Sequence, residues 1–286
     1  MTVAFIPSPK HGIVHIGPIP LHAYGLMLAI GVLVATRVAE KRWARMGNDP
    51  KDFSGVVIPV VIAGVIGARV YHLFTGYKWS EGGVVGAFEI WKGGLSIWGA
   101  VMGGLIAGLI LARRRHFDGL MLMDAIAPGV VLAQAIGRWG NYFNQELFGR
   151  PTTLPWGLEI DVAHRPVGYE HYATFHPTFL YESLWCLLVF ATLLFVESRF
   201  VLKRGQVFAL YIALYTFGRI WFEALRIDDA TKIFGGIRFN LLLSIVLCIF
   251  GTLWFVWLGR RPDPPAPADP EIGSGKSPIE MDAPPT

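Results

Sequence analysis

Residues 119–149, GLMLMDAIAPGVVLAQAIGRWGNYFNQELFG, join an apolar segment to a polar cluster. The first part, residues 119–137, carries one charged side chain, Asp124, and has about the length of a helix that crosses a bilayer. The second part, residues 137–149, holds an arginine, two asparagines, a glutamine and a glutamate. Such groups are costly at the end of a membrane span unless they bind something polar. The stretch therefore predicts a membrane protein with a polar site at the end of one span.

The composition of the whole chain also indicates an integral membrane protein. Of its 286 residues, 53% are hydrophobic and only 16% are charged, against roughly 25% charged residues in soluble domains. The net charge of +4 is weak evidence for nucleic-acid binding, and no basic patch interleaved with aromatic residues supports it, so we expect no nucleic-acid partner. Cys186 and Cys248 lie far apart in apolar segments, which predicts neither a disulfide framework nor a metal site.

Apolar runs of about 20 residues predict the transmembrane helices. The runs are continuous rather than alternating, which favours helices over a β-barrel. We therefore predict an all-α integral membrane protein with seven transmembrane helices. The predicted spans are residues 16–36, 54–75, 93–112, 119–137, 177–196, 205–225 and 239–259.

The distribution of Lys and Arg predicts the orientation of these spans. Short basic clusters fall in alternate loops, as in residues 113–115, and the positive-inside rule assigns those loops to the cytoplasm. The N-terminus is then outside and the C-terminus cytoplasmic. We expect a seven-span membrane domain over residues 1–259, including a small extracytoplasmic cap over residues 138–176. The Pro-rich residues 260–286 are expected to form a disordered cytoplasmic tail.

This topology brings polar residues from six spans to one depth, near the outer leaflet. Asp124 is the exception, since it maps to the inner half of its span. Candidate site residues at the outer depth are His22, Tyr24, Arg69, Trp98, Arg138, Asn141, Asn144, Glu146, His176, Tyr181, Glu182, Arg219, Glu223 and Arg226.

Two interpretations of this polar set compete. In the first, the groups pair with one another to hold the bundle together: Arg219, Glu223 and Arg226 are spaced i, i+4, i+7 and share a helix face. In the second, the arginines at this depth exceed what the glutamates neutralise, which implies an anionic ligand. Arginine suits phosphate because its planar fork donates bidentate hydrogen bonds and stays charged. The head group of a phospholipid is the anion present at that depth.

The polar motifs, taken in order, resemble one known family. Residues 137–146 are similar to the signature Gly-Arg-x-Gly-Asn-x-x-Asn-x-Glu of the prolipoprotein diacylglyceryl transferases. Further motifs of that family are similar to HAYGLM at 22–27, GAR at 67–69, GGLS at 93–96, HPTFLYE at 176–182 and RIWFEALR at 219–226. The resemblance covers residues from about 20 to 230 in the same seven-span layout.

The resemblance implies a reaction in the bacterial inner membrane. An enzyme of this family moves a diacylglyceryl group from phosphatidylglycerol to the lipobox cysteine of a prolipoprotein, which leaves a thioether and releases glycerol phosphate. No metal or soluble cofactor is expected. The resemblance carries catalytic roles to Arg138, Asn141, Glu146, Arg219, Glu223 and Tyr24, and we expect Arg69, Asn144, His22, His176, Tyr181, Glu182, Arg226 and Trp98 to contribute to substrate binding.

The chain departs from the family at one position. Some members carry a histidine, proposed as a catalytic base, where this chain has Trp98, and an indole N–H cannot accept a proton. His176, His22 and Glu146 are the alternative bases, and a thiol near several arginines has a lowered pKa and needs a base less. A transporter or flippase for an anionic lipid or solute is the competing function; it should show internal repeats and polar residues at both depths.

Overall fold

The structure is a computed structural model of the whole chain. It describes residues 5–9, 12–16, 19–77, 79–89, 94, 96–233 and 235–262. Most of the predicted tail, residues 263–286, lies outside the described residues, as do Gly93 and Leu95 of the GGLS motif.

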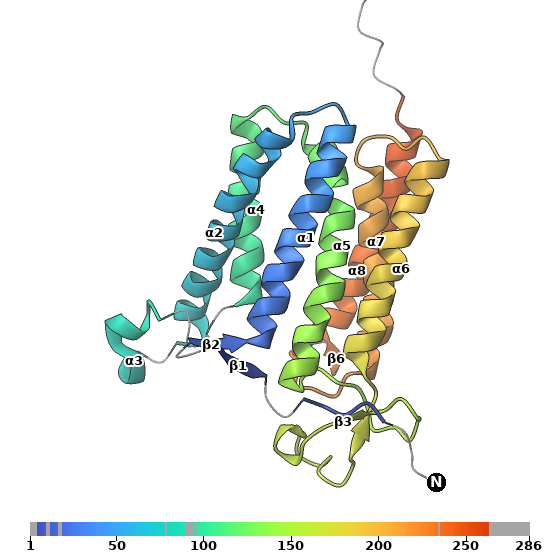
Figure 1. Cartoon of the computed structure of the whole chain (residues 1–286). Helices are drawn as coiled ribbons and strands as arrows, with labels where there is room; N and C mark the ends of the chain where they lie inside the picture. Colours follow the sequence, from blue (N-terminus) through green and yellow to red (C-terminus); the bar gives the residue numbers. More distant parts are fainter. Residues whose placement is uncertain are drawn as a thin grey trace, which may run out of the picture.

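The described part of the chain is mostly helical (Figure 1). Two short strands, β1 (Ile13–Ile16) and β2 (Ile19–His22), precede the helices and pair antiparallel. The helices are α1 (Ala23–Arg45), α2 (Pro50–Thr75), α3 (Trp79–Gly86), α4 (Ile97–Arg114), α5 (Gly119–Asn144), α6 (Thr178–Arg199), α7 (Gln206–Leu225) and α8 (Phe239–Arg260).

Within the described residues, six helices are long and apolar enough to cross a membrane. They are α1, α2, α5, α6, α7 and α8. Large apolar side chains on these helices face outward, as Leu33, Ile62 and Leu253 do with more than half of their surface exposed. Soluble monomers rarely expose so much apolar surface. The chain is therefore a multi-pass membrane protein. The predicted third span coincides with α4, which is not among the six, so the count of seven stays a prediction.

Local signals at the helix starts explain several of these bounds. Asp118 caps α5, where its carboxylate accepts hydrogen bonds from the backbone N–H groups of Leu120 and Met121 at 3.0 and 3.1 Å. The predicted start of the first span at residue 16 is wrong, because Ile19–His22 form strand β2 and α1 begins at Ala23. Pro20 has no N–H for a helical ladder, which favours a helix that starts after it.

Helix α5 lies at the centre of one group of helices and packs against α1, α6 and α7, while α8 packs against α7 (Figure 1). Helices α2 and α4 form a separate pair that meets the rest mainly through α1. Small residues allow the close approach: a Cβ on Gly129 of α5 would lie 2.6 Å from the carbonyl oxygen of Ala35 on α1. The interior between α5, α6 and α7 is filled by Val131, Val189 and their buried neighbours.

The ends of the bundle differ in character. One end carries the α1–α2, α4–α5 and α6–α7 loops and the end of α8, which hold the basic clusters of the sequence; we call it the basic end (Figure 1). Asp124 lies near this end, and its carboxylate accepts the N–H groups of Gly205 and Phe208 at 2.6 and 2.9 Å at the start of α7. The exceptional depth of Asp124 thus has a structural explanation, because this carboxylate stabilises the beginning of another helix.

The opposite end carries a small folded segment between α5 and α6; we call it the site end (Figure 1). The segment contains β3 (Leu158–Glu159), the 3-10 helix η2 (Val162–His164) and β4 (Thr174–Phe175), and β3 pairs with β4. A buried cluster holds it together, comprising Phe148, Leu158, Ile160, Phe175 and Phe179. The α7–α8 loop adds the hairpin β5 (Lys232–Ile233) and β6 (Ile237–Arg238).

Candidate active site

Three helices bring two arginines to one carboxylate at the site end. Arg138 of α5 and Arg219 of α7 each place a guanidinium nitrogen 2.8 Å from Oε2 of Glu182, which comes from the first turns of α6. The Glu182 side chain is 4% exposed, and the two arginine side chains are 18% and 14% exposed. Arg138 also lies 3.5 Å from the hydroxyl of Tyr215. The shared carboxylate fixes both guanidinium groups side by side at the edge of the buried interior.

A second carboxylate extends this arrangement towards the α7–α8 loop. Glu223 is fully buried and accepts hydrogen bonds from Arg219 at 2.7 Å, from Arg238 at 2.9 Å and, more loosely, from Arg226 at 3.4 Å. Asp228 then braces Arg226 at 2.7 Å and Arg238 at 3.2 Å. We call the seven residues the arginine network: Arg138, Arg219, Arg226, Arg238, Glu182, Glu223 and Asp228.

The environment of Asp228 shows how the network stabilises its carboxylates. Burial alone would raise the pKa of this carboxyl, but hydrogen bonds from Arg226 and the charges of Arg226 and Arg238 hold it below its usual range. In a buried site, breaking one such pair is costly because it leaves an uncompensated charge. The network therefore holds its arginines in fixed positions.

The polar cluster that ends α5 meets the network through an amide. The Oδ1 atom of Asn141 lies 3.4 Å from Arg138, and its Nδ2 donates to Glu146 at 2.8 Å. Asn144 lies 3.4 Å from the same Glu146 oxygen. The chain turns back here because Gln145 adopts a left-handed backbone conformation with φ of 50° at the end of α5. This turn brings Glu146 back over the last turn of the helix.

Tyr24 of α1 packs against the same part of α5. Gly140 lacks a side chain where the ring passes, and a Cβ at that position would lie 2.5 Å from Cδ2 of Tyr24. Gly140 is therefore required for the close approach of the tyrosine ring to the turn that carries Arg138 and Asn141.

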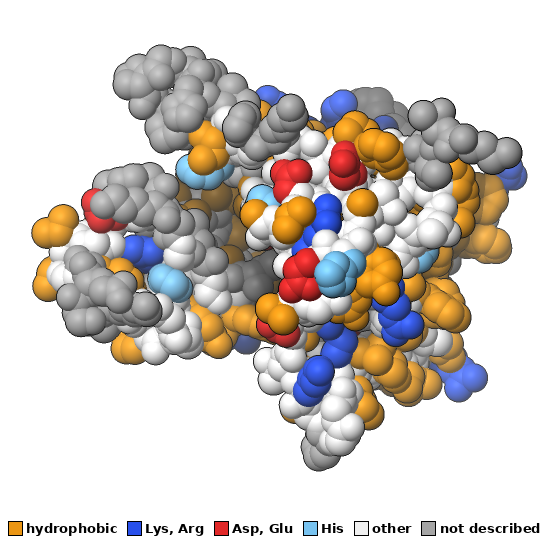
Figure 2. All heavy atoms as spheres, turned by 90° about the horizontal axis from the view of Figure 1, so that it is seen from below, with side chains coloured by type: hydrophobic (Ala, Val, Ile, Leu, Met, Phe, Trp, Pro, Cys, Tyr) orange, Lys and Arg blue, Asp and Glu red, His pale blue; other side chains and the backbone are white. Residues whose placement is uncertain are grey.

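His176 and Tyr181 form a separate contact at the rim. The Nδ1 atom of His176 lies 3.3 Å from the Tyr181 hydroxyl, which also accepts a hydrogen bond from the indole of Trp156 at 2.9 Å. Partial burial lowers the pKa of His176 below its ordinary value of 6.5. Tyr181 precedes Glu182 in α6, so this contact borders the network. Figure 2 shows the site end, where acidic, basic and histidine side chains gather between hydrophobic ones.

Nine of the fourteen predicted residues are not members of the network: six of them lie beside it, as described above, and three lie elsewhere. Arg69 of α2 donates instead to the carbonyl oxygens of Gly86, Ala87 and Gly94 at 2.6, 2.8 and 3.0 Å. These bonds tie α2 to the end of α3 and to the segment between α3 and α4. Trp98 lies on α4 with 47% of its surface exposed, and His22 is exposed at the end of β2.

Conversely, sequence reasoning missed three members of the site. Tyr215 precedes Arg219 by one helical turn, a spacing that does signal a shared face. Asp228 and Arg238 lie in the α7–α8 loop, where no periodicity reveals their partners. Within the described residues, no three His, Cys, Asp or Glu side chains come together as a metal site would require.

The charge balance supports the first interpretation of the polar set, in which the groups pair with one another, and the expected surplus of arginines over carboxylates is not observed among the described residues. The network pairs four arginines with three carboxylates, and Glu146 joins through Asn141, so pairing accounts for most of the charge. Among the described residues, Arg138 contacts Asn141, Tyr215 and Glu182, and Arg219 contacts the two glutamates. A guanidinium carries five N–H groups, so donors remain on both arginines for an anionic ligand.

Fold and site together define a multi-pass membrane protein with a buried arginine network at one end of its helices. Comparison with known proteins gives the family. The family model described as "Prolipoprotein diacylglyceryl transferase" matches residues 11–257. The chain belongs to this family, as the sequence motifs predicted.

Named relatives agree with this assignment. A phosphatidylglycerol–prolipoprotein diacylglyceryl transferase of Frankia alni is 49% identical over 275 residues, which cover 95% of this chain and 71% of that protein. The second such transferase of Streptomyces coelicolor is 45% identical, with 97% and 94% covered. A relative of the same name in Corynebacterium glutamicum is 44% identical, with 96% and 90% covered.

Proposed function

We propose that this protein transfers a diacylglyceryl group from phosphatidylglycerol to a cysteine thiol of prolipoproteins. The observation that carries the proposal is the pair of arginines held by Glu182, with N–H donors left over at the edge of the buried interior. Such a pair suits the phosphate of a lipid head group, because charge-assisted bidentate bonds are strong and arginine stays protonated when desolvated.

The proposed reaction is a substitution at the glycerol carbon that bears the phosphate. The thiolate sulfur forms a bond to this carbon, the carbon–oxygen bond to phosphate breaks, and glycerol phosphate leaves with the electron pair. Negative charge moves from sulfur to phosphate during the step. Fixed donors around that phosphate lower the barrier most when they are already oriented, and Arg138 and Arg219 are suited to this role. Asn141 adds a neutral donor, and Tyr24 orients the head group.

The thiol proton requires an acceptor. Glu146 is the candidate closest to the network, since Asn141 links its carboxylate to Arg138 through two polar contacts of 2.8 and 3.4 Å. His176 is the second candidate, because its lowered pKa keeps it neutral and able to accept a proton at pH 7. Glu182 and Glu223 are engaged by two or three arginines each, so we assign them to positioning.

The proposed location is the bacterial inner membrane, with the site end towards the outer leaflet. The basic clusters at the opposite end support a cytoplasmic assignment for that end. In this orientation α4 also crosses the membrane and brings the number of spans to seven. The N-terminus is outside, and residues 138–176 form the extracytoplasmic cap. A site on the outer side suits a lipobox cysteine that arrives with a secreted precursor.

Transport of an anionic lipid is the less supported function. A transporter should have polar groups in both the outer and the inner half of the membrane. At the basic end, Asp124 accepts two backbone N–H groups of α7, and the buried Arg42 pairs with Glu197. These charges have partners within the protein, and the family membership favours transfer.

The experiment is incubation of the purified protein with phosphatidylglycerol and a peptide that carries a lipobox cysteine. We expect the peptide mass to rise by one diacylglyceryl group, and glycerol phosphate to be released in equal amount. A peptide with serine in place of the cysteine should stay unmodified. Movement of lipid across vesicles without a peptide adduct would decide for transport.

A further inference from the structure

The turn after α5 holds two residues in a left-handed backbone conformation. Gln145 has φ of 50° and Leu147 has φ of 59°, and neither is glycine. Residues with a side chain rarely adopt this conformation, and they keep it only where the surrounding structure imposes it. Glu146, the candidate base closest to the arginine network, lies between them. The contacts that hold these two residues therefore also set the position of the Glu146 carboxylate.

The side chain of Gln145 is 4% exposed, and its amide is hydrogen-bonded on both sides. The Oε1 atom accepts the backbone N–H of Asp161 at 2.8 Å. The Nε2 atom donates to the carboxylate of Asp161 at 2.7 Å and to the carbonyl oxygen of Pro9 at 3.2 Å. Because an ionised glutamate has no donor, it could not make this set of bonds. We call the three residues the glutamine clamp: Pro9, Gln145 and Asp161.

The partners of Gln145 belong to parts of the chain that are anchored outside α5. Asp161 begins η2 in the folded segment between α5 and α6. Pro9 ends the N-terminal segment 5–9, in which Ile6 pairs with Leu158 of β3. The clamp therefore joins the end of α5 to two segments that are distant in sequence.

Leu147 is held from α6. Its carbonyl oxygen accepts the hydroxyl of Thr178, which is 1% exposed at the start of that helix. Between the two anchors, the backbone N–H of Glu146 donates to the carbonyl oxygen of Asn141 at 3.1 Å, and its carboxylate accepts from the amide of Asn141 at 2.8 Å. The turn is thus fixed on both sides of Glu146, and the carboxylate faces the residue that links it to Arg138.

We infer that Gln145 and Asp161 are positioning residues for Glu146 in the transfer reaction. The inference rests on the proposed function, in which Glu146 is the closest acceptor for the thiol proton. In the described part of the chain, the hydrogen bonds of Gln145 and Asp161 do not reach the two arginines that Glu182 holds. The clamp therefore acts on proton transfer and leaves the binding of the lipid phosphate to the arginines.

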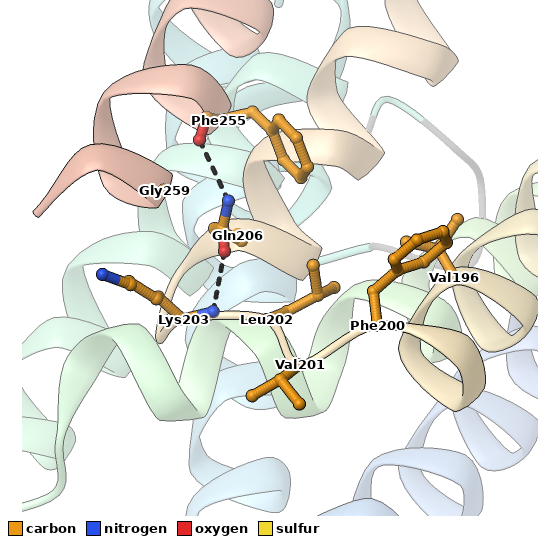
Figure 3. Close-up of a pocket in the computed structure, with 8 residues that line it drawn as sticks. All are labelled: Val196, Phe200, Val201, Leu202, Lys203, Gln206, Phe255 and Gly259. Carbon is orange, nitrogen blue, oxygen red and sulfur yellow. Dashed lines mark hydrogen bonds between the residues drawn. The ribbon is translucent and has the colours of Figure 1, made fainter. Parts of the chain in front are cut away.

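A second buried glutamine provides a matched control at the basic end. Gln206, at the start of α7, is 6% exposed and borders a pocket of about 430 Å³. Its side chain accepts the backbone N–H of Lys203 at 2.7 Å and donates to the carbonyl oxygen of Phe255 at 3.1 Å (Figure 3). Replacing Gln206 removes buried bonds of the same kind far from Glu146.

The first measurement is amide hydrogen exchange of the full-length protein in phosphatidylcholine nanodiscs, read by mass spectrometry. Gln145→Ala breaks the clamp from its buried side, and Asp161→Ala breaks it from its exposed side. Both variants should speed exchange in peptides from residues 141–149 about tenfold, because the turn opens more often. Gln206→Ala should leave these peptides at the native rate. Native exchange of the turn in both clamp variants would overturn the inference.

The second measurement is the rate of transfer from phosphatidylglycerol to a lipobox peptide, referred to the amount of folded protein. Both clamp variants should lower kcat about tenfold, because the proton acceptor is no longer held in place. The KM for phosphatidylglycerol should stay native, since the arginines keep their positions. Gln206→Ala should keep both constants. A native kcat in variants whose turn exchanges faster would show that the clamp does not serve the reaction.

Combination with Glu146→Gln separates positioning from stability. If the clamp acts through Glu146, adding Gln145→Ala to Glu146→Gln should cause no further loss of rate. A further loss as large as that in the native background would mean that the clamp acts elsewhere. Absence of transfer by the native protein would refute the proposed function and with it the catalytic role of the clamp, whereas the exchange rates would still report whether the clamp holds the turn.

Discussion

Replacing Glu182 with glutamine removes one negative charge from between two arginines and keeps the shape of the side chain. In the native protein Oε2 of Glu182 lies 2.8 Å from both Arg138 and Arg219, and the side chain is 4% exposed. An amide oxygen can accept from these donors, but the amide NH2 group repels them and the negative charge is lost. Removing one partner of a buried pair typically costs about 3–5 kcal/mol of stability.

The effect on catalysis should be large for the same reason. Both guanidinium groups lose their common anchor and move, and a displacement of about 1 Å in a catalytic group can reduce the rate about 100-fold. We therefore expect the Glu182→Gln variant to transfer diacylglyceryl groups about 100-fold more slowly. The rate is measured with a lipobox peptide and phosphatidylglycerol, below the melting temperature of the variant.

Ser183→Ala is the matched control on the next residue of α6. Its hydroxyl is buried and donates to the carbonyl oxygen of Ala135 at 2.9 Å, so its loss costs about 1 kcal/mol of stability without touching the arginines. We expect this variant to keep near-normal activity. If Glu182→Gln folds and retains the native rate, the idea that Glu182 positions the two arginines fails.

Three further predictions concern glycines and a histidine. Gly140→Ala should slow transfer about tenfold by pushing the Tyr24 ring away, whereas Gly137→Ala, whose Cβ meets only a leucine methyl group at 3.8 Å, should not; equal rates would contradict this. Gly67→Ala should destabilise the protein by about 1–3 kcal/mol in thermal melts, because its Cβ would collide with the backbone of α4; an unchanged melting temperature would refute the close contact. Since burial lowers the pKa of His176, the unfolded chain takes up a proton first as the pH falls below about 6.5, so the free energy of unfolding should fall there, and His176→Gln should reduce that slope.

The sequence predicts the helices well where apolar runs coincide with strong start signals. Asp118 marks the beginning of α5, and an acidic residue before an apolar run is visible in the sequence. The start of α1 was missed because the residues before it are apolar too, and composition alone does not distinguish a short hairpin from the first turns of a membrane helix.

The site was predictable in depth but not in lateral position. Arg138, Glu182 and Arg219 were expected at one depth, and the structure brings them into contact. Arg69 was expected at the same depth, yet α2 packs against α4 rather than α5, and Arg69 donates to backbone carbonyl oxygens beside α4 instead of joining the arginine network. Helix order around a bundle depends on packing that hydropathy does not encode.

The network residue in the α7–α8 loop could not be predicted from the sequence for a different reason. Arg238 lies 15 positions after Glu223, and only the path of the α7–α8 loop brings its guanidinium to that buried carboxylate. Charged residues in loops are usually solvated, so the sequence gives no reason to single this one out. The family motifs ended at residue 226 and could not supply it.

In the proposed reaction, Arg138 binds the phosphate that leaves during transfer. The most direct test measures the initial rate of peptide modification for Arg138→Ala beside Arg113→Ala, which removes an exposed arginine at the basic end. We expect Arg138→Ala nearly to abolish transfer and Arg113→Ala to retain the native rate. Near-normal transfer by a folded Arg138→Ala protein would show that Arg138 does not bind the leaving phosphate.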